Sequence, residues 1–83
     1  MIMQKEDIIA KVNVFLVDEF ELEEDQLVLD ALLKDDLDIE SLDFVDIAVL
    51  IEKEFKFKMR TEEMAKLRTL DDLYNYISQQ LNN

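Results

Sequence analysis

Apolar residues near the start of the chain recur every three or four positions. They fall on one side of a helix and comprise Ile8, Ile9, Val12, Phe15, Leu16 and Phe20. This spacing is typical of an amphipathic helix that buries one stripe against a core. We therefore predict a first helix from about Gln4 to Phe20.

A second amphipathic segment lies in the middle of the chain. At about 100° per residue, its apolar residues gather on one face of a helix from Ser41 to Phe55. This stripe comprises Phe44, Ile47, Ala48, Ile51 and Phe55. Ser41 precedes the stripe, and we predict that its hydroxyl caps the helix by accepting hydrogen bonds from N–H groups of the first turn.

The same helix has a second apolar arc. Leu42, Val45 and Val49 form it, and it lies next to the acids Asp43 and Asp46. One helix of a small bundle rarely needs apolar residues on two arcs, so we expect part of this arc to be exposed. A small apolar strip beside carboxylates is typical of a transient protein interface. For Val45 the alternative is a place at the edge of the bundle core.

Two further helices are indicated near the end of the chain. Thr61 is placed to cap a short helix from about Glu62 to Leu67. Thr69, with Asp72 three residues later, resembles a capping box that starts a last helix. One core stripe follows, made of Leu70, Leu73, Tyr74, Ile77 and Leu81.

The segment between the first two helices has weaker periodicity. We expect Glu21 to Leu37 to be a long connection that packs on the core through Leu22, Leu27, Leu29, Leu32, Leu33 and Leu37. With 83 residues and no glycine or proline to mark a linker, the chain is predicted to form a single domain over residues 1–83. The predicted fold class is all-α, a small bundle of three main helices plus one short helix, with a long loop between helices 1 and 2.

Acidic residues are concentrated in one part of the chain. There are 21 acids and 9 bases, which gives a net charge of −12. Between Asp18 and Asp46 there are thirteen acids and a single base, Lys34. Such a concentration indicates an electrostatic docking surface for basic proteins and argues against nucleic acid or membrane insertion. The alternative is that the acidity only keeps a small domain in solution.

Histidine and cysteine are both absent. Without them there are no Ser-His or Cys-His nucleophile pairs, no disulfides and no usual zinc ligands, so we do not expect an enzyme. The alternating acids Asp36, Asp38 and Glu40 do not form a calcium loop, because Ser41 and Ile47 stand where such a loop needs Gly and Glu. No metal site is predicted. Without cysteine, a signal peptide or a long apolar run, the chain is expected to be cytoplasmic, and we expect a monomer.

Around Ser41 the sequence resembles the acyl carrier protein family. The stretch Leu37-Asp38-Ile39-Glu40-Ser41-Leu42-Asp43 is similar to the family's Asp-Ser-Leu modification motif. An apolar helix follows and ends in Ile51-Glu52-Lys53-Glu54-Phe55. The resemblance covers most of the chain, and it points to a discrete, type II carrier.

The resemblance implies that Ser41 carries a 4′-phosphopantetheine arm, derived from coenzyme A, through a phosphodiester. Acyl groups would be held as thioesters on the terminal sulfur of the arm and passed between enzymes of fatty-acid or polyketide-type synthesis. A phosphopantetheinyl transferase would install the arm, and acyl-loading, condensing and reducing enzymes would dock through basic surfaces. The start of a helix suits a phosphodiester, because oriented N–H groups and the positive end of the helix dipole meet the anion.

The recognition helix of the family maps onto the second predicted helix. The resemblance implies acidic docking positions at Glu40, Asp43, Asp46, Glu52 and Glu54, and apolar contacts at Leu42, Val45 and Val49. We also expect an acyl pocket in the core, bordered by Leu33, Ile47, Ile51, Met59 and Leu67.

Several positions depart from the family's pattern, and three of them lie in the motif or on the second predicted helix. Asp38 stands where many members have Gly, Glu40 replaces the usual Asp, and Lys53 interrupts an acidic run. These departures suggest a specialised carrier.

Two other interpretations remain open. A non-enzymatic acidic helical adaptor would bind a basic protein surface and would leave Ser41 as a helix cap only. A carrier of aminoacyl or peptidyl units would fit the fold, but it fits the acidity near the motif less well.

Overall fold

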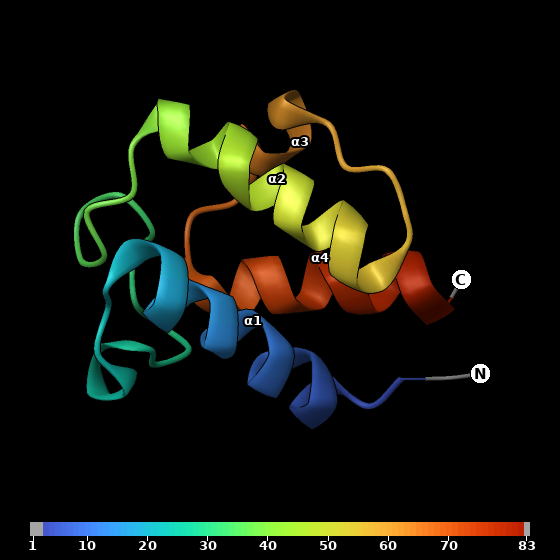
Figure 1. Cartoon of the computed structure of the whole chain (residues 1–83), viewed down its shortest axis with the longest axis horizontal. Helices are drawn as coiled ribbons and strands as arrows, with labels where there is room; N and C mark the ends of the chain where they lie inside the picture. Colours follow the sequence, from blue (N-terminus) through green and yellow to red (C-terminus); the bar gives the residue numbers. More distant parts are fainter. Residues whose placement is uncertain (1–2, 83) are drawn as a thin grey trace.

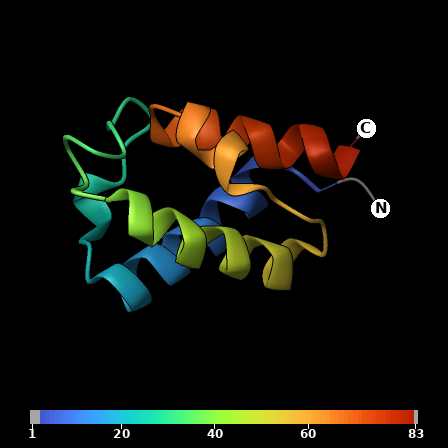
Figure 2. The ribbon, with the colours of Figure 1, turned by 90° about the horizontal axis from the view of Figure 1, so that it is seen from above.

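The computed structural model describes residues 3–82, and within them the chain forms four α-helices. They are α1 (Lys5–Phe20), α2 (Ser41–Phe55), α3 (Thr61–Lys66) and α4 (Leu70–Asn82), with a short 3₁₀ helix, η1 (Glu24–Gln26), in the connection after α1. Helix α1 packs against α4 and α2, and α2 packs against α3. Figures 1 and 2 show the long connection gathered at one end of the bundle. The predicted all-α class, with three main helices and one short one, is confirmed.

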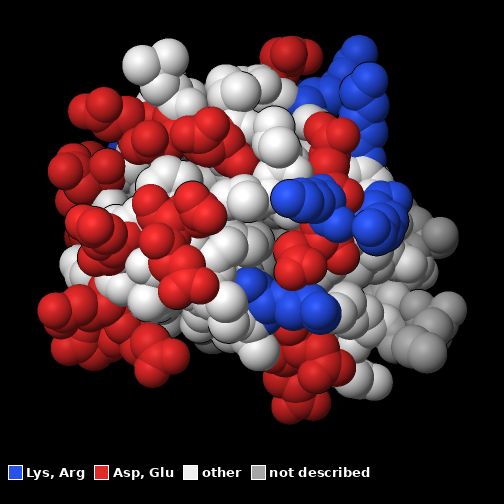
Figure 3. Space-filling view, in the orientation of Figure 1, with Lys and Arg blue, Asp and Glu red and all other residues white. Residues whose placement is uncertain are grey.

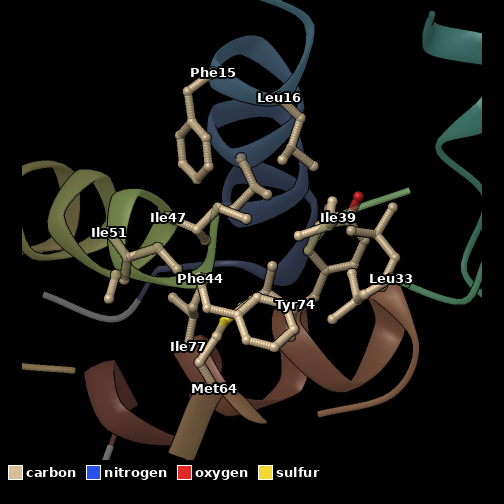
Figure 4. Packing of buried hydrophobic residues seen from close by; sticks show 14 of the residues in the cluster. Phe15, Leu16, Leu33, Ile39, Phe44, Ile47, Ile51, Met64, Tyr74 and Ile77 are labelled. Atoms are coloured by element: carbon tan, nitrogen blue, oxygen red, sulfur yellow. The ribbon is translucent and has the colours of Figure 1, made fainter. Parts of the chain in front are cut away.

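The predicted inward stripe of α2 is confirmed in full. Phe44, Ile47, Ala48, Ile51 and Phe55 are all buried. Figure 4 shows the stripe residues meeting apolar side chains from the other helices and from the connection. The partners in this core come from all parts of the fold and include Ile8, Val12 and Leu16 of α1, Leu33 and Ile39 of the connection, Met64 of α3, and Leu70, Leu73, Tyr74 and Ile77 of α4.

The N-caps predicted for α2 and α3 are each wrong by one residue. Ser41 and Thr61 are the first residues of their helices, and Glu40 and Arg60 hold the N-cap positions in extended conformation. At α2 the cause is the side chain of Asp43, whose Oδ2 accepts the Glu40 N–H at 3.0 Å. The first turn therefore closes on Glu40, and the Ser41 hydroxyl is not needed as a cap.

The bounds of α1 and α3 also differ slightly from the predicted ones. Helix α1 begins at Lys5, with Gln4 as its N-cap, and α3 covers Thr61–Lys66. These differences of one residue are typical of helix ends, where a single hydrogen bond decides the boundary.

The connection is packed on the core largely as predicted. Leu33 and Leu37 are buried, and Ala31 and Ile39 join them. Leu29 is an exception, because its side chain is about half exposed. The segment around Leu29 is held by its backbone instead, since the Leu29 carbonyl accepts the Asp71 N–H at 3.0 Å. In residues 3–82 no helix is both long and apolar enough to cross a membrane.

The capping box predicted at the start of α4 is confirmed. The Thr69 N–H donates to Asp72 Oδ2 at 3.2 Å, and the Asp72 N–H donates to Thr69 Oγ1 at 3.1 Å. The Arg68 N–H also donates to Asp72 Oδ2, at 3.1 Å. These backbone hydrogen bonds, from Thr69 above all, lower the pKa of the Asp72 carboxyl below its usual value near 3.8.

We predict that Asp72→Asn lowers the free energy of unfolding by about 1 kcal/mol at neutral pH, because the charged acceptor of the capping box is lost. The folded-state pKa of Asp72 is lowered, so its stabilising effect is present above the unfolded pKa and disappears as pH falls through the folded value. Urea unfolding at neutral pH and at about pH 3 should show a difference between the two chains that shrinks in acid. Asp30→Asn, at an exposed acid of the connection, serves as the control, and an equal loss in both variants would contradict this account.

Candidate functional site

Ser41 stands at an open end of the bundle, on the first residue of α2. Its side chain is exposed, and within residues 3–82 its hydroxyl makes no hydrogen bond. The N–H groups of Ser41 and Leu42 also have no acceptor among these residues. A hydroxyl and two N–H groups at the start of a fifteen-residue helix are thus left without a hydrogen-bond partner among the described residues.

This end of α2 fits a phosphodiester on Ser41. An anion there would meet the exposed N–H groups and the positive end of the helix dipole. Attachment would break no hydrogen bond of the Ser41 hydroxyl. The carboxylates of Glu40 and Asp43 oppose a further negative charge, but Glu40 is exposed and Asp43 is only half-buried, so water and salt screen part of their repulsion.

The backbone just before Ser41 turns through a left-handed residue. Asp38 has φ 57°, and its side chain is exposed between the buried Leu37 and Ile39. This conformation is the one for which Gly is usual and Asp or Asn is tolerated. The departure at Asp38 therefore preserves the backbone conformation that places Ile39 in the core and Glu40 at the helix start.

The second apolar arc of α2 is exposed. The exposed fraction is 80% for Leu42, 47% for Val45 and 57% for Val49. Val45 is thus not a core residue. Figure 3 shows acidic side chains covering the end of the molecule formed by the carboxyl end of α1, the connection and the start of α2. The exposed arc lies in this acidic surface, with Asp43 and Asp46 on the same helix.

A pocket of about 300 Å³ adjoins the exposed arc. Its walls come from α1 and α2: Glu19, Phe20, Asp46, Val49 and Leu50. Asp46 and Val49 were predicted as docking residues, and Glu19 belongs to the acidic segment expected to attract basic proteins. Phe20 and Leu50 were not predicted to lie on a docking surface. Phe20 is the last residue of α1 and Leu50 lies in α2. Only the place of Phe20 at the end of an amphipathic helix could have suggested a shared surface with α2.

The five residues expected to border an acyl pocket divide into two groups. Leu33, Ile47, Ile51 and Met59 are buried in the main core cluster. Leu67 is only partly buried and packs against the edge of that cluster. The structure thus places four of the five residues in the core and the fifth, Leu67, at its edge. Glu52 and Glu54, the outermost predicted docking acids, lie at the other end of α2 from Ser41.

Within residues 3–82 no group of three or more acidic side chains is arranged to hold a metal ion.

The comparisons with known proteins identify the family. The sequence profile described as "Phosphopantetheine attachment site" matches residues 14–77. The chain belongs to the acyl carrier protein family. The acyl carrier protein of Petrotoga mobilis is 38% identical over 80 residues, which cover 96% of this chain and 94% of the relative. That of Thermotoga maritima is 34% identical over 77 residues, which cover 93% of this chain and 95% of the relative.

Membership of this family makes the chain a carrier in acyl shuttling, with 4′-phosphopantetheine as a covalently attached group. Interaction with a phosphopantetheinyl transferase and with synthase enzymes goes with that role.

We predict that the backbone at residue 38 limits what can replace Asp38. Asp38→Gly should leave the melting temperature unchanged or raise it, whereas Asp38→Val should lower the free energy of unfolding by about 1–2 kcal/mol, because a β-branched residue does not tolerate this φ. Thermal unfolding followed by circular dichroism measures both.

Asp38→Asn removes the charge but keeps a side chain suited to this conformation, so it separates charge from backbone effects. An equal loss of stability in the Gly and Val variants would show that the conformation of residue 38 does not matter.

Proposed function

We propose that Ser41 is the attachment residue for the 4′-phosphopantetheine arm of this carrier. The observation that carries the proposal is the exposed hydroxyl of Ser41 at the amino end of α2, inside the stretch that resembles the family's modification motif. The chain has one other serine, Ser78, which lies near the end of α4 and is partly buried.

The residues around Ser41 bind the phosphodiester and orient the serine, but they do not activate its hydroxyl. The N–H groups of the first turn of α2 stabilise the phosphodiester, and the bundle holds the serine at a fixed position. The chain has no histidine to deprotonate the hydroxyl, so a separate transferase that uses coenzyme A must make the bond. The thiol at the end of the arm supplies the thioester linkage, because the chain has no cysteine. We infer that the protein itself catalyses no reaction.

Docking of partner enzymes is proposed to use the outer side of α2. Leu42, Val45 and Val49 provide exposed apolar area, and a rim of carboxylates from Glu40, Asp43, Asp46, Glu52 and Glu54 attracts basic side chains. The pocket between α1 and α2 extends this surface to Glu19 and Phe20. Exposed carboxylates raise the rate of encounter more than the lifetime of the complex, which suits a carrier that visits several enzymes.

The acyl chain is proposed to enter the core beside α2, among Leu33, Ile47, Ile51, Met59 and Leu67. This proposal is supported by the apolar side chains of all five residues and by their place in or against one core cluster. Because this part of the core is filled by side chains, entry requires them to move apart. The pathway we propose is fatty-acid or polyketide-type synthesis, in which this chain serves as a carrier and acts as a cytoplasmic monomer.

We predict that incubation with coenzyme A and a broad-specificity phosphopantetheinyl transferase adds the mass of one phosphopantetheine unit to the wild type. Ser41→Ala should gain nothing, while Ser78→Ala should gain one unit like the wild type. Intact-mass spectrometry decides between these outcomes. Modification of Ser41→Ala would refute Ser41 as the attachment residue. If the wild type stayed unmodified with several transferases, the acidic adaptor would become the better interpretation.

We predict that Asp46→Asn slows association with the transferase by about two- to five-fold at low ionic strength, because it removes one carboxylate from the docking rim. Glu6→Gln removes one exposed acid from the first turn of α1 and is the matched control. Stopped-flow or biosensor kinetics at low and high salt give the comparison. Equal effects of the two substitutions would show that total charge, rather than the surface on α2, governs docking.

A further inference from the structure

A second pocket lies between the connection and α3, away from the outer arc of α2. Its volume is about 270 Å³, and it is lined by Leu32, Lys34, Asp35, Ala65, Leu67 and Arg68. Apolar side chains thus share its wall with two cations. This combination is unusual for a protein with a net charge of −12, because Lys34 is the only base between Asp18 and Asp46.

Backbone pairing builds the pocket from two segments that are distant in sequence. The Leu33 N–H donates to the Arg68 carbonyl at 2.8 Å, and the Leu70 N–H donates to the Ala31 carbonyl at 2.9 Å. Leu32 and Thr69 form an antiparallel bridge between these bonds. Figure 2 shows the connection passing beside the start of α4. The backbone at Lys34 and Arg68 is therefore held in place by these bonds, and both side chains are exposed.

The two cations on the pocket wall have no close carboxylate partner. The ion pairs within residues 3–82 join Lys5 to Asp71 and Lys66 to Glu63. Asp35 lines the pocket, and Asp72 is near enough to feel the charge of Arg68, but neither lies within 4.0 Å of a Lys34 or Arg68 nitrogen. Two like charges on one pocket repel each other until an anion enters between them.

Lys34 also links the pocket to the end of α2 that carries Ser41. Its Nζ lies 5.7 Å from the centre of the Phe44 ring. Phe44 belongs to the first turn of α2, three residues after Ser41. Lys34 Nζ therefore lies over the ring of a residue in the helix turn that begins with Ser41.

We propose that the pocket binds an acyl group that ends in a carboxylate, with Lys34 and Arg68 holding the carboxylate and Leu32, Ala65 and Leu67 covering the carbon chain. This inference rests on the proposed function of Ser41. A hollow of about 270 Å³ suits a short chain rather than a long one. A chain ending in a methyl group gains nothing from the cations and belongs instead in the apolar core.

The test compares two acyl groups of equal carbon number on the arm. The arm is loaded with a glutaryl group, which ends in a carboxylate, or with a pentanoyl group, which ends in a methyl group. In ¹H–¹⁵N spectra the glutaryl group should shift the amide signal of Ala65 in the wild type but not in a chain that carries both Lys34→Gln and Arg68→Gln. Any shift of this signal caused by the pentanoyl group should be equal in the two chains. With a ¹³C label in the glutaryl carboxylate, its pKa should be about half a unit lower on the wild type than on a Lys34→Gln, Arg68→Gln double variant.

The control variant is Lys58→Gln, which removes an exposed base outside the pocket and should keep the lower carboxylate pKa. If the arm attaches but the carboxylate pKa is the same on the wild type and the double variant, the pocket inference is wrong and the role of Ser41 stands. If no arm attaches, the proposed function fails. The pocket inference is then decided on the unmodified chain with free glutarate and pentanoate, and it falls if glutarate leaves the Lys34 and Arg68 signals in place.

Discussion

The inward stripe of α2 is the contact on which the rest of the structure depends. It contributes five of the buried residues, and it meets α1, α3, α4 and the connection in one core. Truncating one buried Ile or Phe to Ala typically costs about 2–5 kcal/mol, whereas a domain of this kind has only about 5–15 kcal/mol of total stability. The stripe therefore fixes both the place of α2 and its rotation about its own axis.

The functional side of α2 follows from that rotation. Once Phe44, Ile47 and Ile51 point into the core, Leu42, Val45 and Val49 must point away from it. The same constraint leaves Ser41 exposed at the helix start, where its hydroxyl is not used as a cap. An exposed apolar arc and thirteen acids between Asp18 and Asp46 lower the stability of the folded chain. They lie at one end of the molecule, where the docking of a partner would offset this loss.

Much of the fold could be predicted from periodicity, because the apolar residues of a buried stripe recur every three or four positions in the sequence. The bounds of α2 and the burial of its five stripe residues are examples. Details that rest on a single side chain could not be predicted in this way. Glu40 holds the N-cap because Asp43 Oδ2 accepts its N–H, and spacing alone favoured Ser41.

Contacts between segments that are distant in sequence also could not be predicted. The pairing of Leu33 with Arg68 depends on how the connection lies against the start of α4, and no periodic pattern encodes it. Leu29 was expected to anchor the connection, but its carbonyl does so while its side chain stays half exposed. The resemblance around Ser41 identified the family that the comparisons then established, although a serine at a helix start would usually be only a cap.

The most direct test of the division of α2 into a structural and a functional side is to map the transferase onto the unmodified chain by amide NMR. The account predicts that the largest signal changes fall on Leu42, Val45 and Val49 and on Glu19 and Phe20 at the end of α1, with little change along α4. Changes centred on α4 or on the first turn of α1 would contradict it.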